Sequence, residues 1–218
     1  MTDDEYITHF TMWAALKSPL IIGTDIRKLS AASYSIYTNP AILALSQDPL
    51  GSAPAQIWRY PVASVDQYGG GEIQMWSGSL ANNDQVVLLL NAANQEMLLN
   101  ATLPDIFVDN GGAASTQAQS SWDVYDLWAN RMPNATANMI LAANSTANAT
   151  SFASYYYNAT ATSYADGIKA NNSLLMGTYT SSVAPMGTIQ ATVPKHGVAA
   201  FRLRPKGAAT TKYKRDEL

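Results

Sequence analysis

The chain has 218 residues, of which 47% are hydrophobic and 10% aromatic, enough to bury a core and to exclude a disordered chain. Charged residues make up only 13% and the formal net charge is −3, which gives no basic surface of the kind that binds nucleic acid. Cysteine is absent, so disulfides and thiolate metal sites are excluded, and no apolar run is long enough to span a bilayer. We therefore expect neither nucleic acid nor a membrane as a partner.

The first 17 residues have the pattern of an amphipathic helix. Thr2 and Glu5 have the spacing of a capping box, in which a hydroxyl and a carboxylate bind the free amides of a helix start. Apolar residues then recur at intervals of three and four, with Phe10 and Trp13 on the same stripe. Pro19 ends the helix. The apolar stripe must therefore pack against another part of the protein.

Residues 20–23 form a short, continuously apolar run, the pattern of a parallel strand that is covered on both faces. Asp25 follows at the carboxyl end of this strand, and we interpret it as a cap for the next turn, with an active-site role as the alternative. A second helix is expected from about Ser30, and Asn39-Pro40 has the pattern of an N-cap and first-turn proline for a third. The order helix, strand, helix predicts one slice of an α/β architecture.

After Gly51 the sequence changes to short alternating or aliphatic runs that are separated by Gly, Asn, Asp and Pro, which is typical of all-β folds. Eight strands are predicted, enough for a β-sandwich of Greek-key type. They cover residues 56–62, 72–76, 85–91, 96–103, 121–126, 173–180, 187–193 and 198–203. Residues 134–161 are rich in Asn, Ala, Ser and Thr, and we expect a long excursion there.

The first 51 residues can also be compared as a unit with known families. The segments are Met1-Thr2-Asp3-Asp4-Glu5-Tyr6, His9-Phe10, Met12-Trp13-Ala14, Lys17-Ser18-Pro19-Leu20-Ile21-Ile22-Gly23-Thr24-Asp25-Ile26-Arg27 and Gln47-Asp48-Pro49-Leu50-Gly51. In this order and spacing they resemble the end of the catalytic barrel in the α-galactosidases of glycoside hydrolase family 27, especially fungal members. Residues 193–199 are similar to the closing strand of that family's C-terminal antiparallel domain.

This resemblance implies a fold that combines α/β and all-β parts. Residues 1–50 would be the end of a (β/α)8 TIM barrel, residues 51–205 an antiparallel β-sandwich of Greek-key type, and residues 206–218 a polar tail. It aligns residues 20–23 with the eighth barrel strand, which leaves the first seven upstream of Met1. A methionine precedes this helix in the family, so we expect a fragment or truncated gene product, with a genuine short protein as the alternative.

The resemblance also implies a function, the hydrolysis of terminal non-reducing α-D-galactose from galactosides with retention of configuration and without a cofactor or metal. Retaining glycosidases need two carboxyl groups about 5 Å apart, one as nucleophile and one as acid. The family carries them on the fourth and sixth barrel strands, which have no counterpart here, so we assign no catalytic or substrate-binding residue. The chain alone is expected to be inactive. The oligomeric state is not predicted.

The alternative function is that of a non-catalytic carbohydrate-binding sandwich or an inactive remnant of an enzyme. Five aromatic residues could form a platform on which sugars stack, although core packing is the favoured interpretation for them. They are Trp58, Trp76, Trp122, Tyr125 and Trp128. Structural roles are also favoured for five other residues. Asp3, Asp4 and Glu5 are interpreted as helix caps, and His9 and His196 are given structural roles.

Six Asn-x-Ser/Thr sequons lie in the β-rich part, where Arg131 and Lys169 are the only cations between Arg59 and Lys195. They begin at Asn100, Asn134, Asn144, Asn148, Asn158 and Asn171. Glycans there would supply the hydration that charged side chains do not, whereas an Asn-rich composition could also produce sequons by accident.

The last four residues, Arg-Asp-Glu-Leu, differ by one residue from a Lys-Asp-Glu-Leu retrieval signal. Together with the sequons they indicate the secretory pathway, with secretion and retention in the endoplasmic reticulum lumen as the two alternatives.

Overall fold

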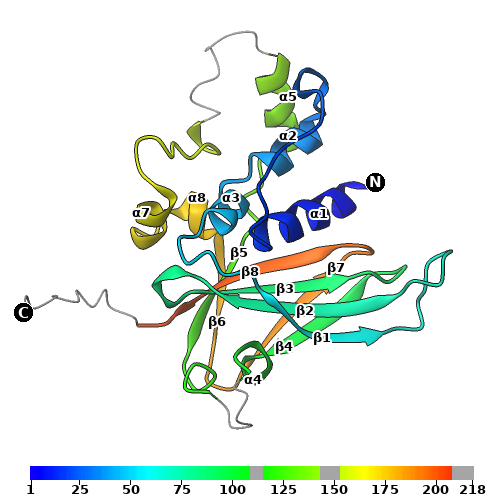
Figure 1. The fold of residues 1–218 in the computed structure, drawn as a ribbon, viewed down its shortest axis with the longest axis vertical. Coiled ribbons are helices and arrows are strands. Elements are labelled where there is room, and N and C mark those ends of the chain that lie inside the picture. The colour runs from blue at the N-terminus through cyan, green and yellow to red at the C-terminus, as the bar shows by residue number, and fades with distance from the viewer. Residues whose placement is uncertain (109–114, 143–152, 208–218) are drawn as a thin grey trace, which may run out of the picture.

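The computed structural model describes residues 1–108, 115–142 and 153–207 (Figure 1). Two antiparallel sheets form a sandwich, and a layer of helices covers one outer face (Figure 1). The larger sheet has the strand order β1-β2-β3-β8-β5-β6, and the smaller sheet pairs β4 with β7. The strands are β1 (Ala55–Pro61), β2 (Glu72–Ser79), β3 (Gln85–Asn91), β4 (Met97–Thr102), β5 (Trp122–Asp126), β6 (Thr178–Val183), β7 (Thr188–Val193) and β8 (Val198–Pro205).

The helices fall into two groups along the chain. The first group precedes the sheets and consists of α1 (Asp3–Ala15), the 3-10 turn η1 (Ile26–Lys28), α2 (Ala31–Tyr37) and α3 (Pro40–Ser46). The second group lies in connections between strands and consists of η2 (Ala81–Asn83), α4 (Leu103–Ile106), α5 (Asn134–Ala142), α7 (Tyr164–Lys169) and α8 (Ser173–Met176). The predicted excursion after residue 134 begins with α5, and residues 143–152 lie outside the described part.

Strand β3 explains why the two layers hold together. Its side chains alternate between two cores: Val87 and Leu89 face the smaller sheet, while Val86 and Leu88 face the helices. All four are fully buried. A strand that is covered on both faces needs a continuous apolar run, and residues 85–91 have one. The predicted bounds of this strand are confirmed.

The helical layer is held by apolar contacts with the larger sheet. Phe10 and Ala14 of α1 and Ile42 and Leu45 of α3 are all buried against the side chains that β3 and β8 present on this face. Complete burial of one large aliphatic or aromatic side chain stabilises a fold by about 1.5–3 kcal/mol. Residues 1–50 are therefore an integral part of this structure, because their apolar stripe covers a face of the sheet.

The predicted helix starts are confirmed in detail. The Thr2 hydroxyl and the Glu5 carboxylate make both bonds of the capping box, with Thr2 N donating to Glu5 Oε2 at 2.7 Å. The helix ends at Ala15, two residues before the predicted end, because Lys17 has a left-handed backbone conformation with φ of 60°. Asn39 caps α3, as predicted, by accepting from the backbone amides of Ala41 and Ile42.

Two strand predictions are wrong. Residues 20–23 form no strand, and Ile21 is 78% exposed, because nothing in the described part of the chain pairs with this segment. Residues 173–180 begin as the helix α8, which Asn172 caps by accepting from Leu174 N at 3.0 Å. Gly177 then turns the chain with φ of 84°, at a point where a Cβ atom would lie 2.4 Å from Asp126 O. Strand β6 can start only after this turn.

We predict that Asn39→Ala lowers the free energy of unfolding by about 2–3 kcal/mol. About 1 kcal/mol is the lost N-cap, and the rest is the unpaired carbonyl of Leu127, to which Asn39 Nδ2 donates at 3.2 Å. Urea unfolding followed by circular dichroism measures the change. Ser30→Ala, which removes the exposed cap of α2, is the matched control and should cost about 1 kcal/mol. Equal losses in the two variants would contradict the role of the Leu127 contact.

Candidate functional site

The segment between α1 and η1 carries the residues that sequence analysis placed at a barrel-strand end. Asp25 Oδ1 accepts from Arg27 N at 3.1 Å, and the Arg27 guanidinium donates to both Asp25 oxygens at 2.9 and 3.0 Å. These bonds hold the pKa of Asp25 below its usual range. The predicted capping role is therefore confirmed, and the carboxylate is engaged by its own turn. Ile21 and Ile26 stay exposed on either side of it.

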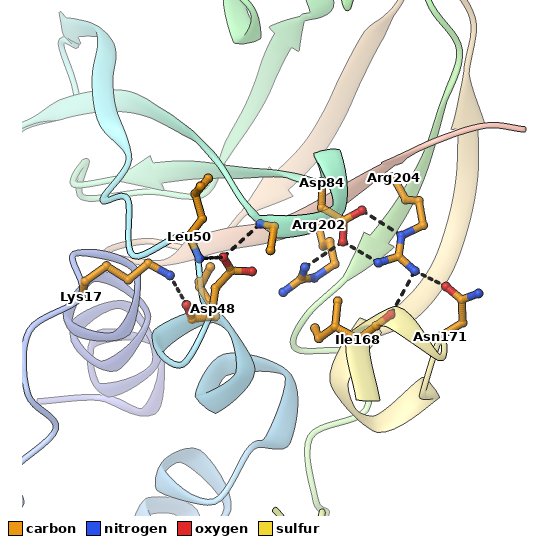
Figure 2. Close-up of polar contacts among 10 residues, drawn as sticks. Lys17, Asp48, Leu50, Asp84, Ile168, Asn171, Arg202 and Arg204 are labelled. Carbon is orange, nitrogen blue, oxygen red and sulfur yellow. Dashed lines mark hydrogen bonds and ion pairs between the residues drawn. The ribbon is translucent and has the colours of Figure 1, made fainter. Parts of the chain in front are cut away.

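A buried charge network lies where the helices meet the larger sheet (Figure 2). The side chains of Asp84 and Arg202 are fully buried, and Arg202 Nη1 lies 2.9 Å from Asp84 Oδ2. Arg204 approaches the same carboxylate with Nε at 2.8 Å and Nη2 at 2.7 Å, a bidentate geometry. Its Nη1 donates to Ile168 O at 3.2 Å and to the side chain of Asn171. The carboxylate of Asp84, in the turn before β3, is thus paired with two arginines of β8, and Arg204 extends the network to α7.

A second carboxylate, Asp48, joins the helices to the sheet beside this network (Figure 2). Asp48 Oδ1 accepts from Leu50 N at 3.1 Å and from Ala81 N at 3.0 Å, so the loop after α3 is bonded to the turn before β3. Lys17 donates to Leu45 O, and burial lowers its pKa. The arrangement fixes the relative position of the two layers, and it offers no pair of free carboxylates for catalysis.

The two histidines lie where α1 meets the turn before β8. His196 Nδ1 lies 2.9 Å from Glu5 Oε1, and Thr8 Oγ1 donates to His196 O at 2.9 Å. His9, Asp66 and Asn91 also line a cavity of about 310 Å³ at this place. Sequence analysis gave both histidines structural roles but missed the Glu5–His196 pair, because 191 residues separate the partners and no local pattern connects them.

No group of three or more His, Cys, Asp or Glu side chains that could bind a metal occurs among residues 1–108, 115–142 and 153–207. In the same ranges, no helix is long and apolar enough to cross a membrane.

The five candidate aromatics are divided among the cores. Trp122 is buried between the two sheets and Trp58 packs at the edge of the same core. Trp76 and Trp128 pack beneath the helices, and Tyr125 contacts the cluster around α8. Core packing is therefore the role that the structure gives to these side chains, and they form no common platform.

Four of the six sequons lie in the described residues, and the asparagine of each is exposed. Asn100 lies on β4, Asn134 begins α5, Asn158 caps a turn, and Asn171 follows α7. The side-chain Oδ1 of Asn100 accepts from Gln190, and that of Asn134 accepts from Arg131. Asn144 and Asn148 lie outside the described residues.

Comparisons with known proteins give one consistent result. The family described as the alpha galactosidase C-terminal beta sandwich domain matches residues 70–153. The chain is 50% identical over 204 residues to an alpha-galactosidase of Saccharomyces paradoxus and 48% identical to one of Torulaspora delbrueckii. Each alignment covers 94% of this chain and 42% of the relative. The chain thus spans less than half the length of these curated relatives.

The solved structures agree. An alpha-galactosidase of Saccharomyces cerevisiae superposes with a TM-score of 0.87 at 48% identity, over 94% of this chain and 44% of that one. Alpha-galactosidase I of Mortierella vinacea gives a TM-score of 0.62 at 27% identity, over 94% and 36%. The similarity includes residues 1–50 as well as the sandwich.

We predict that Glu5→Gln destabilises α1 at neutral pH and that this effect shrinks as the pH falls below the ordinary carboxyl pKa. Hydrogen bonds from His196 and from the Thr2 backbone hold the pKa of Glu5 below its ordinary 4.5. A lowered carboxyl pKa stabilises the fold above the ordinary pKa, and this contribution is lost as the pH falls through the lower, folded-state pKa. Thermal unfolding of both proteins between pH 3 and pH 7 measures the difference. Asp4→Asn, which removes a charge from the same helical turn, is the control, and it should give a smaller difference at neutral pH.

Proposed function

The chain belongs, as their C-terminal part, to the α-galactosidases of glycoside hydrolase family 27, and we propose that it acts as the sandwich end of such an enzyme. This proposal rests on the similarity to two relatives. The alpha-galactosidase of Saccharomyces paradoxus is 50% identical over 94% of this chain, and the structure of that of Saccharomyces cerevisiae superposes with a TM-score of 0.87. The substrate would be a terminal α-D-galactose of a galactoside, removed with retention of configuration. The two carboxylates would come from barrel strands that precede Met1 in a longer protein.

The contribution of these 218 residues would be structural. Residues 1–50 would close the barrel, residues 51–205 would form the sandwich that supports it, and residues 206–218 would be a tail. The exposed apolar side chains of Ile21 and Ile22 support this division, because a strand buried by barrel neighbours would need them and a surface loop would not. The bond of Asp48 to Ala81 and the bonds of Glu5 and Thr8 to His196 would keep the barrel end fixed on the sandwich.

The protein would pass through the secretory pathway. The proposal rests on the six sequons, of which the four described ones have exposed asparagines, and on the Arg-Asp-Glu-Leu terminus, which lies outside the described residues. Secretion and retention in the endoplasmic reticulum remain the two alternatives for its final location.

We predict that the 218-residue chain releases no galactose from an aryl α-galactoside, because the two carboxylates of double displacement would belong to the barrel strands ahead of residues 20–23. A longer chain, in which the N-terminal part of the Saccharomyces paradoxus relative is joined ahead of Met1, should hydrolyse it. Chromogenic assays of both proteins, prepared free of host enzyme, measure this. The N-terminal part alone is the control. Activity of the short chain at an enzymatic rate, or a folded but inactive longer chain, would contradict the proposal.

We also predict that the protein carries several N-glycans when it is made through a eukaryotic secretory route. An endoglycosidase should lower its apparent mass, and each of Asn100→Gln, Asn134→Gln, Asn158→Gln and Asn171→Gln should remove one glycan if that site is occupied. Mass spectrometry of the intact protein measures the steps. Asn94→Gln, at an exposed asparagine outside any sequon, is the matched control. A mass that the enzyme leaves unchanged would show that the sequons are accidental.

A further inference from the structure

Two arginines link elements of the fold from positions that are only partly covered. The side chains of Arg131 and Arg204 are 18% and 16% exposed. Those of Arg27 and Arg59 are largely exposed, and that of Arg202 is fully buried. Salt screens exposed ion pairs and affects buried pairs much less. The bonds of Arg131 and Arg204 therefore depend on what lies over the open side of each guanidinium.

Arg204 forms the outer end of the network around Asp84 (Figure 2). Its Nε and Nη2 bind Asp84, and its Nη1 donates to Asn171, the first residue of a sequon. Asn171 follows α7 with φ of 57°, and its backbone amide and the next one donate to carbonyls of α7, as in a Schellman motif. This motif fixes the backbone from which the side chain extends. The side-chain oxygen faces Arg204, and the nitrogen Nδ2 points away from it (Figure 2).

Arg131 joins three helices in a similar way. Its Nε donates to Ser35 Oγ of α2 at 2.8 Å, and its Nη2 lies 3.6 Å from Asp3 Oδ2 of α1. Nη2 also donates at 3.2 Å to Asn134 Oδ1, and Asn134 is the first residue both of α5 and of a sequon. A sequon asparagine thus completes the bonds of each partly covered arginine.

The other two described sequons serve as a contrast, because their asparagines accept from uncharged groups. Asn100 Oδ1 accepts from Gln190 Nε2 at 2.8 Å, across the pair of strands β4 and β7. Asn158 Oδ1 accepts from Thr160 N and Ala161 N at 3.1 and 3.2 Å, within its own turn. The arginine contacts therefore divide the four described sequons into two pairs.

We propose that N-glycans on Asn134 and Asn171 are structural parts of the two arginine bridges, an inference that rests on the glycosylation included in the proposed function. An N-glycan is attached to Nδ2 of asparagine, so its first sugar lies beside the guanidinium that Oδ1 of the same amide binds. Arg131 and Arg204 each have one open side, and a sugar there keeps water and salt ions away from it. The ion pairs with Asp3 and Asp84 then act in a lower local dielectric constant and are stronger.

Attachment of the sugar also fixes the orientation of each amide. A free asparagine can turn either its oxygen or its nitrogen inward, and only the oxygen can accept from an arginine. A nitrogen that carries a sugar must stay on the outer side, where Asn134 and Asn171 are exposed. The glycan therefore holds Oδ1 in place as an acceptor.

Removal of single sequons in the glycosylated protein tests the proposal. Thr136→Ala and Ser173→Ala abolish the sequons of Asn134 and Asn171 but keep both asparagines and their bonds to arginine. Thr160→Ala, which abolishes the sequon of Asn158, is the matched control. The thermal midpoint of each variant, made through a eukaryotic secretory route, is measured in about 10 mM and about 1 M sodium chloride, where the Debye length is about 30 and 3 Å.

Between the two salt concentrations, Thr136→Ala and Ser173→Ala should each lose about 2–4 °C more than the parent protein. Thr160→Ala should follow the parent, because its glycan covers no charged group. The same variants made without glycans should all have the salt dependence of their unglycosylated parent, which separates the effect of the sugar from that of the lost hydroxyl. Loss of activity on heating, measured in the longer chain described above, gives a second readout with the same expected order.

Glycopeptide mass spectrometry of the parent protein separates this inference from the glycosylation on which it rests. Occupied sites at Asn134 and Asn171 with equal salt dependence in all variants would overturn the inference and leave the glycosylation standing. An equal effect of Thr160→Ala would overturn it in favour of a general hydrating role of glycans. An effect that persists without glycans would assign it to the hydroxyl, and unoccupied sites would refute the inference together with the glycosylation of these residues.

Discussion

The ion pair between Asp84 and Arg202 is the buried polar contact on which the larger sheet depends, because it joins the turn before β3 to β8. Both side chains are fully buried at the boundary of sheet and helices, and Arg204 gives the same carboxylate two more bonds (Figure 2). Removing one partner of a buried pair typically costs about 3–5 kcal/mol, because the remaining charge is left without compensation. Arg202 Nε and Nη2 have no partner among the described residues, so the arginine depends on Asp84 for its compensation. A polar contact of this kind permits only one relative placement of the elements that it joins.

The apolar contacts between the helices and the sheet restrict the relative placement of these two layers less strictly. Val86 and Leu88 of β3 could pack against many arrangements of Phe10, Ala14 and Leu45, since burial has little directional preference. The bonds of Asp48 to the turn before β3, and of Glu5 and Thr8 to the turn before β8, select one arrangement at two separate points. The helices are therefore fixed to the sandwich at both ends of their contact. This rigidity suits a part that would support a catalytic barrel.

Local chemistry decided which parts of the fold could be predicted from the sequence. Caps at Thr2 and Asn39 and the aliphatic run of β3 act over a few residues, so their patterns were sufficient. Residues 20–23 have the pattern of a buried strand, but a strand also needs neighbours, and the sequence could not show where those were. The pairs Glu5–His196 and Asp84–Arg202 join residues more than 100 positions apart, and no spacing rule connects them. These polar pairs could therefore be found only in the structure, whereas the β-sandwich could be predicted from the sequence.

The position of β8 in the sheet has a consequence for how the protein is made. Strand β8 (Val198–Pro205) is the last of the described strands, yet it lies between β3 and β5 and contacts α1. Its arginines also complete the pair with Asp84. During synthesis, the helices and the first three strands leave the ribosome without this partner and must wait for more than 100 further residues before their cores can close. Such late, long-range closure is slow and leaves apolar surface open to misassembly in the meantime. A nascent chain of this kind would need protection by chaperones until its final strand arrives.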